Sequence, residues 1–486
     1  MDLSEIGGVL MIFLLLILAG FIGVVLFRTL RFTPTVQPVT ESEAIEFDKD
    51  RAIANLAELI KCKTISYSDH SLEDDGEFEK LIGKLPGLYP NVFAKCEFRR
   101  LPDRALLLRW PGKAGDAPSV MMAHYDVVPV NAENWDKPPF DAIIQDGVMW
   151  GRGTLDTKVT FNGALFAADH LIARGFVPAQ DVYFAFSGGE EVNGKGAPNI
   201  VAYFQARGIT PAMVVDEGGA VVENVVPGVK RPCGLIGIAE KGMMNAQFRC
   251  TSAGGHASAP RPHTPVGILA KACTVIEEHP FPCHLEGPAA QMFDTLGRHS
   301  TFLFRLIFAN LWCFGWIIDF LGRHSGGEIN ALIRTTVAFT QMEGSSARNV
   351  IPPEAKMVAN MRLNPADSVE SALAYLRSMV DEEDGVEISA LESFEPSRVS
   401  RTDCEGWEKV ASAVAENWPG CIVAPSLMVQ CSDSRHWGAI SDKVYRFSAM
   451  DLTSAERASI HGNNERVRLE GICKAAEFYI RLLKKC

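Results

Sequence analysis

The apolar positions of the chain, from about residue 48 onward, alternate between helical spacing and short continuous runs. Apolar residues three and four apart predict helices over Lys49 to Lys61, Phe161 to Arg174 and Pro198 to Arg207. Continuous apolar runs predict strands over Ser119 to Val128, Asp181 to Phe186 and Ala212 to Val215. Strands that alternate with helices indicate an α/β domain whose helices pack on the faces of a central sheet.

The pattern changes near residue 242 and indicates a second, inserted domain. A strand is expected over Met243 to Thr251, and a helix that Thr264 caps and Pro265 begins. Two further strand-like runs follow, Ile333 to Gln341 and Ala355 to Leu363. The chain then returns to the α/β pattern and closes with a helix from about 465 to 484. We therefore expect a catalytic domain in two parts, 48–241 and 364–486, around an insert at 242–363.

The first residues form a separate apolar segment. Residues 8–27 carry no charge, and this length spans a bilayer as a helix. A cleaved signal peptide is the alternative, but Asp2 and Glu5 precede the segment and no small-residue cleavage site follows it. We expect a single-pass anchor at 1–32 and a polar tether at 33–47. Arg28 and Arg31 place the rest of the chain on the cytoplasmic side.

A second apolar run, residues 301–321, is interrupted by Arg305 and Asp319. The uncharged stretch between them is too short to span a membrane. Two interpretations stay open, a buried helix of the insert or an apolar surface that contacts lipid or an apolar substrate.

Composition excludes several classes of protein. A net charge of -12 without a long basic run excludes a nucleic-acid binder. The twelve cysteines form no CxxC pair, so a cysteine-bound zinc is not expected. Their apolar surroundings indicate buried thiols and a reducing compartment.

Residues of metal-binding types follow the predicted strands. His124 and Asp126 are two apart on one expected strand, so their side chains point the same way. Taken singly, such residues are usually turn histidines or helix caps. Together, at the carboxyl ends of strands, they favour a site for zinc or a similar divalent ion. The residues of these types are His124, Asp126, Asp156, Glu190, Glu191, Asp216 and His461.

Two adjacent glutamates, Glu190 and Glu191, follow the strand that ends at Phe186. Neighbouring carboxylates repel, and each raises the pKa of the other. A solvated loop tolerates such a pair, whereas a bound cation gives each carboxylate a separate role.

The strings that carry these residues resemble a known family, the dinuclear zinc peptidases that include carboxypeptidase S, aminoacylase and succinyl-diaminopimelate desuccinylase. The closest resemblance is to the branch of carboxypeptidase S and the N-fatty-acyl-amino-acid hydrolase/synthases, over roughly residues 50–484. The matching strings are MAHYDVVPV, WDKPPF, WGRGTLDTK, SGGEEVNGKGA, VVDEGG, AEKG, GGHASAP, RNVIPPEA, SDSRHW and IHGNNE. The resemblance implies a zinc-exopeptidase-like catalytic domain with a mixed sheet, and an inserted α+β lid that forms dimers.

The family's roles carry over by position. Asp156 is expected to bridge two zinc ions, or other divalent ions such as cobalt or manganese. His124 and Asp216 are expected to complete the coordination of one ion, and Glu191 and His461 that of the other. Glu190 is left as the general base. Asp126 is the second catalytic residue, expected to hold and polarise His124.

The resemblance also suggests substrate-binding residues. His256 is expected to stabilise the developing oxyanion, reaching the site of a neighbouring subunit in a homodimer. Asn349 and Arg362 lie at ends of lid strands, and Arg435 is suited to bind a free carboxylate of the substrate. For both arginines, a structural ion pair is the open alternative.

Two positions depart from the family. Thr157 stands where an aspartate often follows the bridging residue, and Ser187-Gly188-Gly189 replaces a frequent Gly-His-Asp. Neither departure removes a ligand, but both alter the surroundings of the ions.

These observations predict a membrane-anchored dizinc amidohydrolase or carboxypeptidase. It would hydrolyse the amide bond to a C-terminal amino acid, in an N-acyl amino acid or a short peptide of the Gly-Xaa type. A catalytically silent metal-binding scaffold at the membrane is the alternative, as is a structural membrane protein. The acyl group, the amino acid, the reaction direction in vivo, the metal, the oligomeric state and the membrane face stay open.

Overall fold

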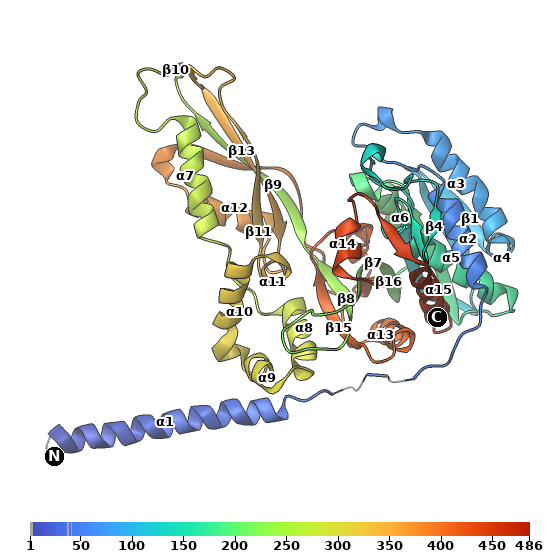
Figure 1. The fold of residues 1–486 in the computed structure, drawn as a ribbon, viewed down its shortest axis with the longest axis horizontal. Coiled ribbons are helices and arrows are strands. Elements are labelled where there is room, and N and C mark those ends of the chain that lie inside the picture. Colours follow the sequence, from blue (N-terminus) through green and yellow to red (C-terminus); the bar gives the residue numbers. More distant parts are fainter. Residues whose placement is uncertain (1–2, 36–37, 40) are drawn as a thin grey trace.

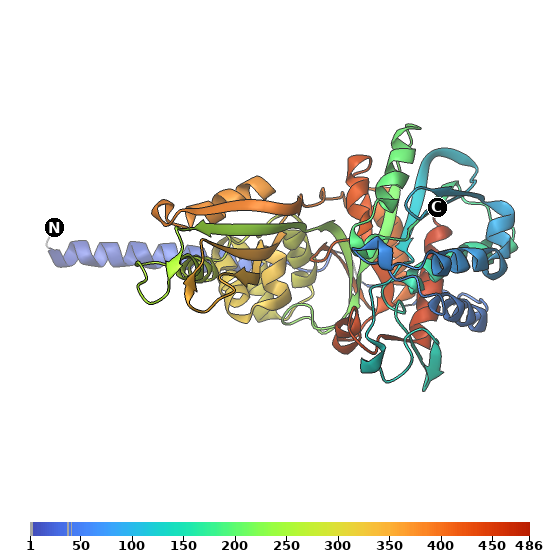
Figure 2. The same ribbon diagram turned by 90° about the horizontal axis from the view of Figure 1, so that it is seen from above.

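A computed structural model describes residues 3–35, 38–39 and 41–486. Residues 1–2 of the predicted anchor, and 36–37 and 40 of the predicted tether, lie outside the described residues. Helix α1 (Leu3–Arg31) projects from the rest of the chain, and a lid and a catalytic domain lie side by side along the long axis (Figures 1 and 2). Among the described residues, α1 is the one helix long and apolar enough to cross a membrane by itself, as an anchor or a signal sequence does.

A mixed sheet forms the centre of the catalytic domain. Within the described residues eight strands pair in the order β1-β2-β6-β3-β7-β16-β8-β15. β6, β3, β7 and β16 run parallel to one another. β1 and β2 form an antiparallel edge in which β2 also pairs antiparallel with β6, and β8 runs antiparallel to β7 and β16. The strands are β1 (Glu97–Leu101), β2 (Ala105–Trp110), β3 (Ala114–His124), β6 (Gln180–Ser187), β7 (Met213–Val222), β8 (Cys233–Glu240), β15 (Ile422–Met428) and β16 (Val444–Asp451).

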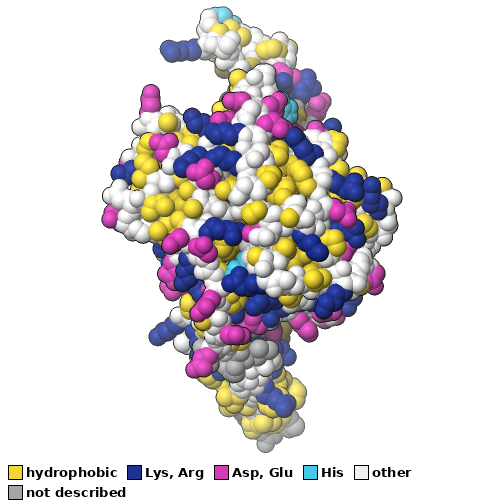
Figure 3. Space-filling model, turned by 90° about the vertical axis from the view of Figure 1, so that its right-hand side faces the viewer, with side chains coloured by type: hydrophobic (Ala, Val, Ile, Leu, Met, Phe, Trp, Pro, Cys, Tyr) yellow, Lys and Arg dark blue, Asp and Glu magenta, His cyan; other side chains and the backbone are white. Residues whose placement is uncertain are grey.

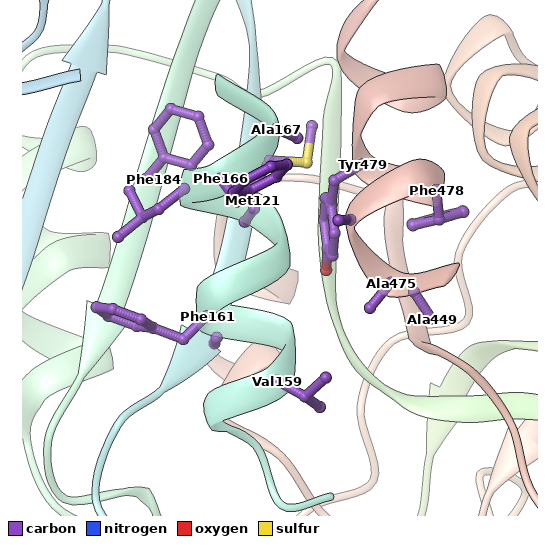
Figure 4. Close-up of a cluster of buried hydrophobic side chains, with 14 of the residues drawn as sticks. Met121, Val159, Phe161, Phe166, Ala167, Phe184, Ala449, Ala475, Phe478 and Tyr479 are labelled. Carbon is purple, nitrogen blue, oxygen red and sulfur yellow. The ribbon is translucent and has the colours of Figure 1, made fainter. Parts of the chain in front are cut away.

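Helices cover both faces of this sheet, as the α/β pattern predicts. On one face α5 packs against α15 (Figure 4). The two helices lie so close that a side chain at Gly163 would place its Cβ 3.3 Å from the backbone carbonyl of Ala475. On the other face Phe204 of α6 packs against Tyr183 and Trp437. The helices of this domain are α2 (Lys49–Ile60), α3 (Asp75–Leu88), α4 (Pro90–Lys95), α5 (Lys158–Ala173), α6 (Gly196–Gln205), α13 (Glu405–Asn417), α14 (Ser454–Ser459) and α15 (Leu469–Leu483).

Three short strands form a separate sheet next to α14 and α15. β4 (Ile143–Gln145), β5 (Val148–Trp150) and β17 (Arg466–Arg468) pair antiparallel. Because β17 precedes α15, the last helix begins at Leu469, four residues later than expected.

The lid is larger than the predicted insert. In the described chain a four-stranded sheet pairs in the order β11-β13-β9-β14, and α7 and α12 pack on it. The expected boundary at residue 363 is wrong, because β14 pairs with β9 and so belongs to the lid. The elements are β9 (Gly242–Thr251), β10 (Gly255–His256), α7 (Pro265–Glu278), β11 (Thr336–Glu343), β12 (Val350–Ile351), β13 (Glu354–Leu363), α12 (Val369–Ser378) and β14 (Val386–Phe394).

A helical segment joins α7 to β11, and it does not contain the single helix that the apolar run 301–321 suggested. The run is split into α9 and α10, which meet at an angle of 106°. Some of its side chains are buried and others exposed, so neither interpretation of this run describes all of it. The helices are α8 (Gly287–Arg298), α9 (Phe302–Phe308), α10 (Leu311–Ser325) and α11 (Gly327–Ile333).

Candidate metal centre

The candidate ligands meet where β3 and β6 end, beside the first half of the neighbouring strand β7. His124 is the last residue of β3, and Glu190 and Glu191 follow β6. β6 and β7 both run parallel to β3, so their carboxyl ends meet at one edge of the sheet, where α/β proteins place their sites. Asp156 lies just before α5, and His461 lies in the turn after α14.

His124 is buried and is held from behind by the chain that follows it. Its Nδ1 lies 3.0 Å from the backbone oxygen of Asp126 and 3.4 Å from Oδ1 of the same residue. The tautomer that donates from Nδ1 leaves Nε2 as an acceptor for a metal ion. The expectation that both residues stand on one strand is wrong, because β3 ends at His124.

Asp156 lies between the two histidines. Its Oδ1 is 2.9 Å from Nε2 of His124, and its Oδ2 is 3.0 Å from Nε2 of His461. The same His461 nitrogen is 3.1 Å from Oε2 of Glu191. The hydrogen-bonded carboxylates of Asp156 and Glu191 raise the pKa of His461 to about 10. One carboxylate facing two imidazoles is the arrangement that a bridging ligand requires.

Asp126 fixes the two glutamates. Its Oδ1 accepts the backbone N–H of Glu190 at 3.1 Å, and its Oδ2 accepts that of Glu191 at 3.2 Å. Burial, reinforced by the charges of neighbouring carboxylates, raises the pKa of Glu190 well above its ordinary value. Burial and then the charge of Asp156 raise the pKa of Glu191 to about 7. A cation among these carboxylates would relieve their repulsion.

The structure brings Glu217, and not Asp216, to His124. Oε1 of Glu217 lies 3.1 Å from Nε2 of His124. The carboxylate of Asp216 instead accepts the backbone N–H groups of Glu217, at 2.9 Å, and Ser434, at 3.0 Å. Burial, followed by the charges of Glu217 and Asp433, raises the pKa of Asp216 to about 8. The expectation that Asp216 faces the ion is therefore corrected to its neighbour.

Glu465 is a residue that sequence reasoning missed. It is fully buried, and its carboxylate accepts hydrogen bonds from the Arg152 side chain and from the backbone N–H groups of Gly153, Leu155 and Asp156. It thereby shapes the turn that presents Asp156. The signal was its place in IHGNNE, four residues after His461.

Arg435 lies at the edge of the centre. It donates to the backbone oxygen of Ser432 at 2.6 Å and to Oδ1 of Asn193 at 3.0 Å, and its guanidinium lies 5.0 Å from the ring centroid of Phe394. Arg362 of β13 donates to Sγ of Cys431 at 3.1 Å. Within the described residues neither arginine forms a salt bridge, so the structural ion pair has no support.

His256 and Asn349 lie elsewhere. His256 is in β10 and Asn349 directly precedes β12, at the tip of the lid that points away from the catalytic domain (Figure 1). Both are exposed, and Asn349 accepts the backbone N–H of Ala257 at 3.0 Å. The chain does not bring them to its own metal centre, and their contact with a neighbouring subunit stays a prediction.

The donor set fits divalent metal ions. One atom each from His124, Asp156 and Glu191 lie within 4.8 Å of one another, and so do atoms from His124, Glu190 and Glu217. Oε1 of Glu191 is buried and has no hydrogen-bond partner among the described residues. A metal ligand would have such an oxygen, because the ion takes the place of a hydrogen-bond donor. Imidazole with carboxylates suits zinc and also manganese or cobalt.

Comparison with known proteins identifies the family. Residues 120–485 match the model of Peptidase family M20/M25/M40. The chain belongs to this family. It is 33% identical to the N-fatty-acyl-amino acid synthase/hydrolase of Xenopus tropicalis, over 99% of this chain and 96% of the relative. It is 32% identical to the probable carboxypeptidase S-like 2 of Dictyostelium discoideum, over 96% of this chain and 92% of the relative.

A solved structure has the same fold. The M20 metallo-carboxypeptidase Sso-CP2 of Sulfolobus solfataricus superposes with a TM-score of 0.65, at 18% identity, over 89% of this chain and 98% of that one. The expected fold and family branch are thus confirmed, and the protein is an enzyme of the metallopeptidase and amidohydrolase class.

Proposed function

We propose that the protein is a dizinc amidohydrolase that releases an amino acid with a free carboxylate from an N-acyl amino acid or a short peptide. The observation that carries the proposal is Asp156, one of whose carboxylate oxygens faces His124 and the other His461. Glu190 stands beside this pair with the raised pKa of a general base.

The residues would divide as follows. His124, Asp156 and Glu217 would hold one ion, and Asp156, Glu191 and His461 the other. When bound, a pair of zinc ions activates water and polarises the carbonyl of the scissile amide. Glu217 takes the place that the family resemblance gave to Asp216, which stands behind it and orients its backbone.

Glu190 would carry the proton. Its carboxylate takes a proton from the attacking water and passes it to the leaving amine, and proton transfer of this kind is most efficient when the pKa of the base lies near the working pH. Asp126 fixes the backbone of Glu190 through the N–H bond, so the side chain extends from a rigid turn.

Arg435 would bind the carboxylate of the substrate. Its guanidinium is held by two neutral acceptors, Ser432 and Asn193, and forms no salt bridge among the described residues. A guanidinium fork matches a carboxylate in shape and charge. Arg362 is a second candidate, since it reaches Cys431 from the root of the lid.

A fatty acyl group is the favoured acyl portion. The relative from Xenopus tropicalis is named for N-fatty-acyl amino acids and matches nearly the whole chain. A Gly-Xaa carboxypeptidase is the second candidate, favoured by the carboxypeptidase S-like relative at nearly equal identity. Helix α1 would anchor either enzyme in a membrane, with Arg28 and Arg31 on the cytoplasmic side. A homodimer through the lid belongs to the same proposal.

Amino-acid release by the detergent-extracted protein tests this proposal. An N-oleoyl amino acid and a Gly-Xaa dipeptide are offered side by side, with and without a chelator. Chelator-sensitive cleavage of the oleoyl substrate alone supports the fatty-acyl hydrolase, and cleavage of the dipeptide alone supports the carboxypeptidase. No cleavage of either substrate by protein that contains zinc would favour the silent scaffold.

A further inference from the structure

The bent pair α9–α10, here called the apolar hairpin, exposes large apolar side chains. Trp312, Trp316 and Phe320 are spaced four residues apart and form one stripe on α10, with exposed fractions of 60%, 67% and 52%. Phe302 and Leu303 add exposed side chains from α9. By contrast, the face of the catalytic domain that looks away from the lid mixes apolar side chains with both signs of charge (Figure 3). Soluble surfaces rarely gather so many large apolar groups.

The hairpin is fastened to α1 at its bend. Asn310 is fully buried, and its Nδ2 donates to the backbone oxygen of Val25 at 3.3 Å and to Oγ1 of Thr29 at 3.1 Å. In return, Nε of Arg28 donates to the backbone oxygen of Ala309 at 3.2 Å. Val25 and Thr29 are buried, whereas the residues around them on α1 are exposed. The contact therefore fixes the register between the two elements.

This register sets the depth of the hairpin. The ring of Trp312 packs edge-on against Phe21, with centroids 5.8 Å apart. Phe21 lies six residues before Phe27, the last uncharged residue ahead of Arg28. At 1.5 Å per residue, Phe21 lies about 9 Å inside the end of the apolar stretch. If α1 spans a bilayer, Trp312 lies below the headgroups on the same side.

The hairpin is too short and too bent to cross a bilayer. α10 has 15 residues, so its length is about 22 Å, which is shorter than a hydrocarbon core of about 30 Å. The bend of 106° prevents α9 from extending it. Basic side chains lie where headgroups are expected, since Arg298 donates to the backbone oxygen of Thr33, just beyond α1.

We propose that the apolar hairpin inserts into the same leaflet as the end of α1 and is covered by phospholipid acyl chains. We choose lipid over a second copy of the chain because the hairpin contacts α1 at Val25 and Thr29, directly next to the exposed apolar part of α1 that would face lipid. The proposal rests on α1 as a membrane anchor and is independent of the hydrolysis reaction. It makes the lid, and not only the N-terminus, a membrane-bound part of the enzyme.

Tryptophan quenching by brominated lipid tests the insertion. The full chain has eight tryptophans, none of them in α1, and only Trp312 and Trp316 are in the hairpin. The protein is reconstituted in phosphatidylcholine vesicles with plain or brominated acyl chains, and flotation confirms that α1 holds it there. Tryptophan emission of the wild type should be lower in brominated than in plain vesicles, by at most the part of the emission that two of the eight tryptophans contribute. Trp312→Phe/Trp316→Phe should abolish that difference.

The matched control is Trp407→Phe/Trp418→Phe, which removes two tryptophans from the catalytic domain and should keep the quenching. Circular dichroism checks that both variants fold. Equal quenching of the wild type and the hairpin variant in floated vesicles would overturn the insertion, and sedimentation in detergent would then show whether a second copy covers this face. Failure to float would overturn the anchor and the insertion together. Neither result depends on whether the protein hydrolyses any substrate.

Discussion

Oδ1 of Asp126 accepts the backbone hydrogen of Glu190 across 3.1 Å. Oδ2 of Asp126 accepts the backbone N–H of Glu191, and the backbone oxygen of Asp126 lies within hydrogen-bond distance of Nδ1 of His124. One residue thus orients a metal ligand from each of two strands as well as the proposed base. The role implied by the family, to hold His124 from behind, stays a proposal, and the geometry extends it to the two glutamates.

Asp126→Asn should weaken catalysis because an amide offers one acceptor where the carboxylate offers two. The NH2 group would face one of the two backbone N–H groups, and the turn that carries both glutamates would loosen. We expect kcat to fall about 10- to 100-fold, with a similar loss of metal affinity. Initial rates and a metal titration measure both effects. Asp146→Asn, at an exposed turn, is the control, and unchanged values for Asp126→Asn would contradict the role.

Glu217→Gln should remove metal, and Asp216→Asn should affect metal much less. Glu217 faces His124, whereas Asp216 accepts two backbone N–H groups behind it. Elemental analysis of the two purified variants measures the difference. If Asp216→Asn loses an ion and Glu217→Gln keeps both, the original assignment from the family resemblance is right.

This pair shows what the sequence could and could not predict. The string VVDEGG contains two adjacent carboxylates, and the sequence predicted that one of them, Asp216, is a ligand at the end of a strand. β7 continues through both residues, however, and adjacent side chains in a strand point to opposite faces. Only one of the two can face His124, and the choice depends on the register of β7 in the sheet, which the local sequence does not contain.

The lid boundary was missed for a similar reason. β14 pairs with β9, from which more than a hundred residues separate it, and the apolar pattern of a strand does not say which sheet it joins. The bend in the apolar hairpin was missed because Asn310 makes its partners on α1, far away in sequence. Helix α2, which has local signals, was predicted within a residue, whereas the expected end of β3 was four residues too late and that of β7 seven residues too early.

Lys241 should make stability depend on pH. It is buried at the junction of β8 and β9, where Nζ donates to the backbone oxygens of Ala331 and Arg334 and to Oγ1 of Thr336. Burial, with a smaller contribution from the charge of Arg362, lowers its pKa from 10.5 to about 7. Between these values the folded protein releases a proton that the unfolded chain keeps, so the free energy of unfolding rises with pH.

The comparison with Lys241→Met isolates this effect. From pH 7 to pH 9 we expect the wild type to gain on the order of 2 kcal/mol relative to the variant. Urea unfolding in detergent, followed by tryptophan fluorescence, measures the two curves, and Lys113→Met at an exposed position is the control. A difference that does not change with pH would show that Lys241 titrates normally.

The central claim is that Glu190 moves the proton while its neighbours hold two ions, and Glu190→Gln tests it most directly. The variant keeps the size of the side chain and removes the base. We expect two metal ions per chain by elemental analysis and a fall in kcat of about 100- to 10,000-fold, with the N-acyl amino acid or dipeptide that the wild type cleaves. Turnover near the wild-type rate with both ions bound would contradict the account.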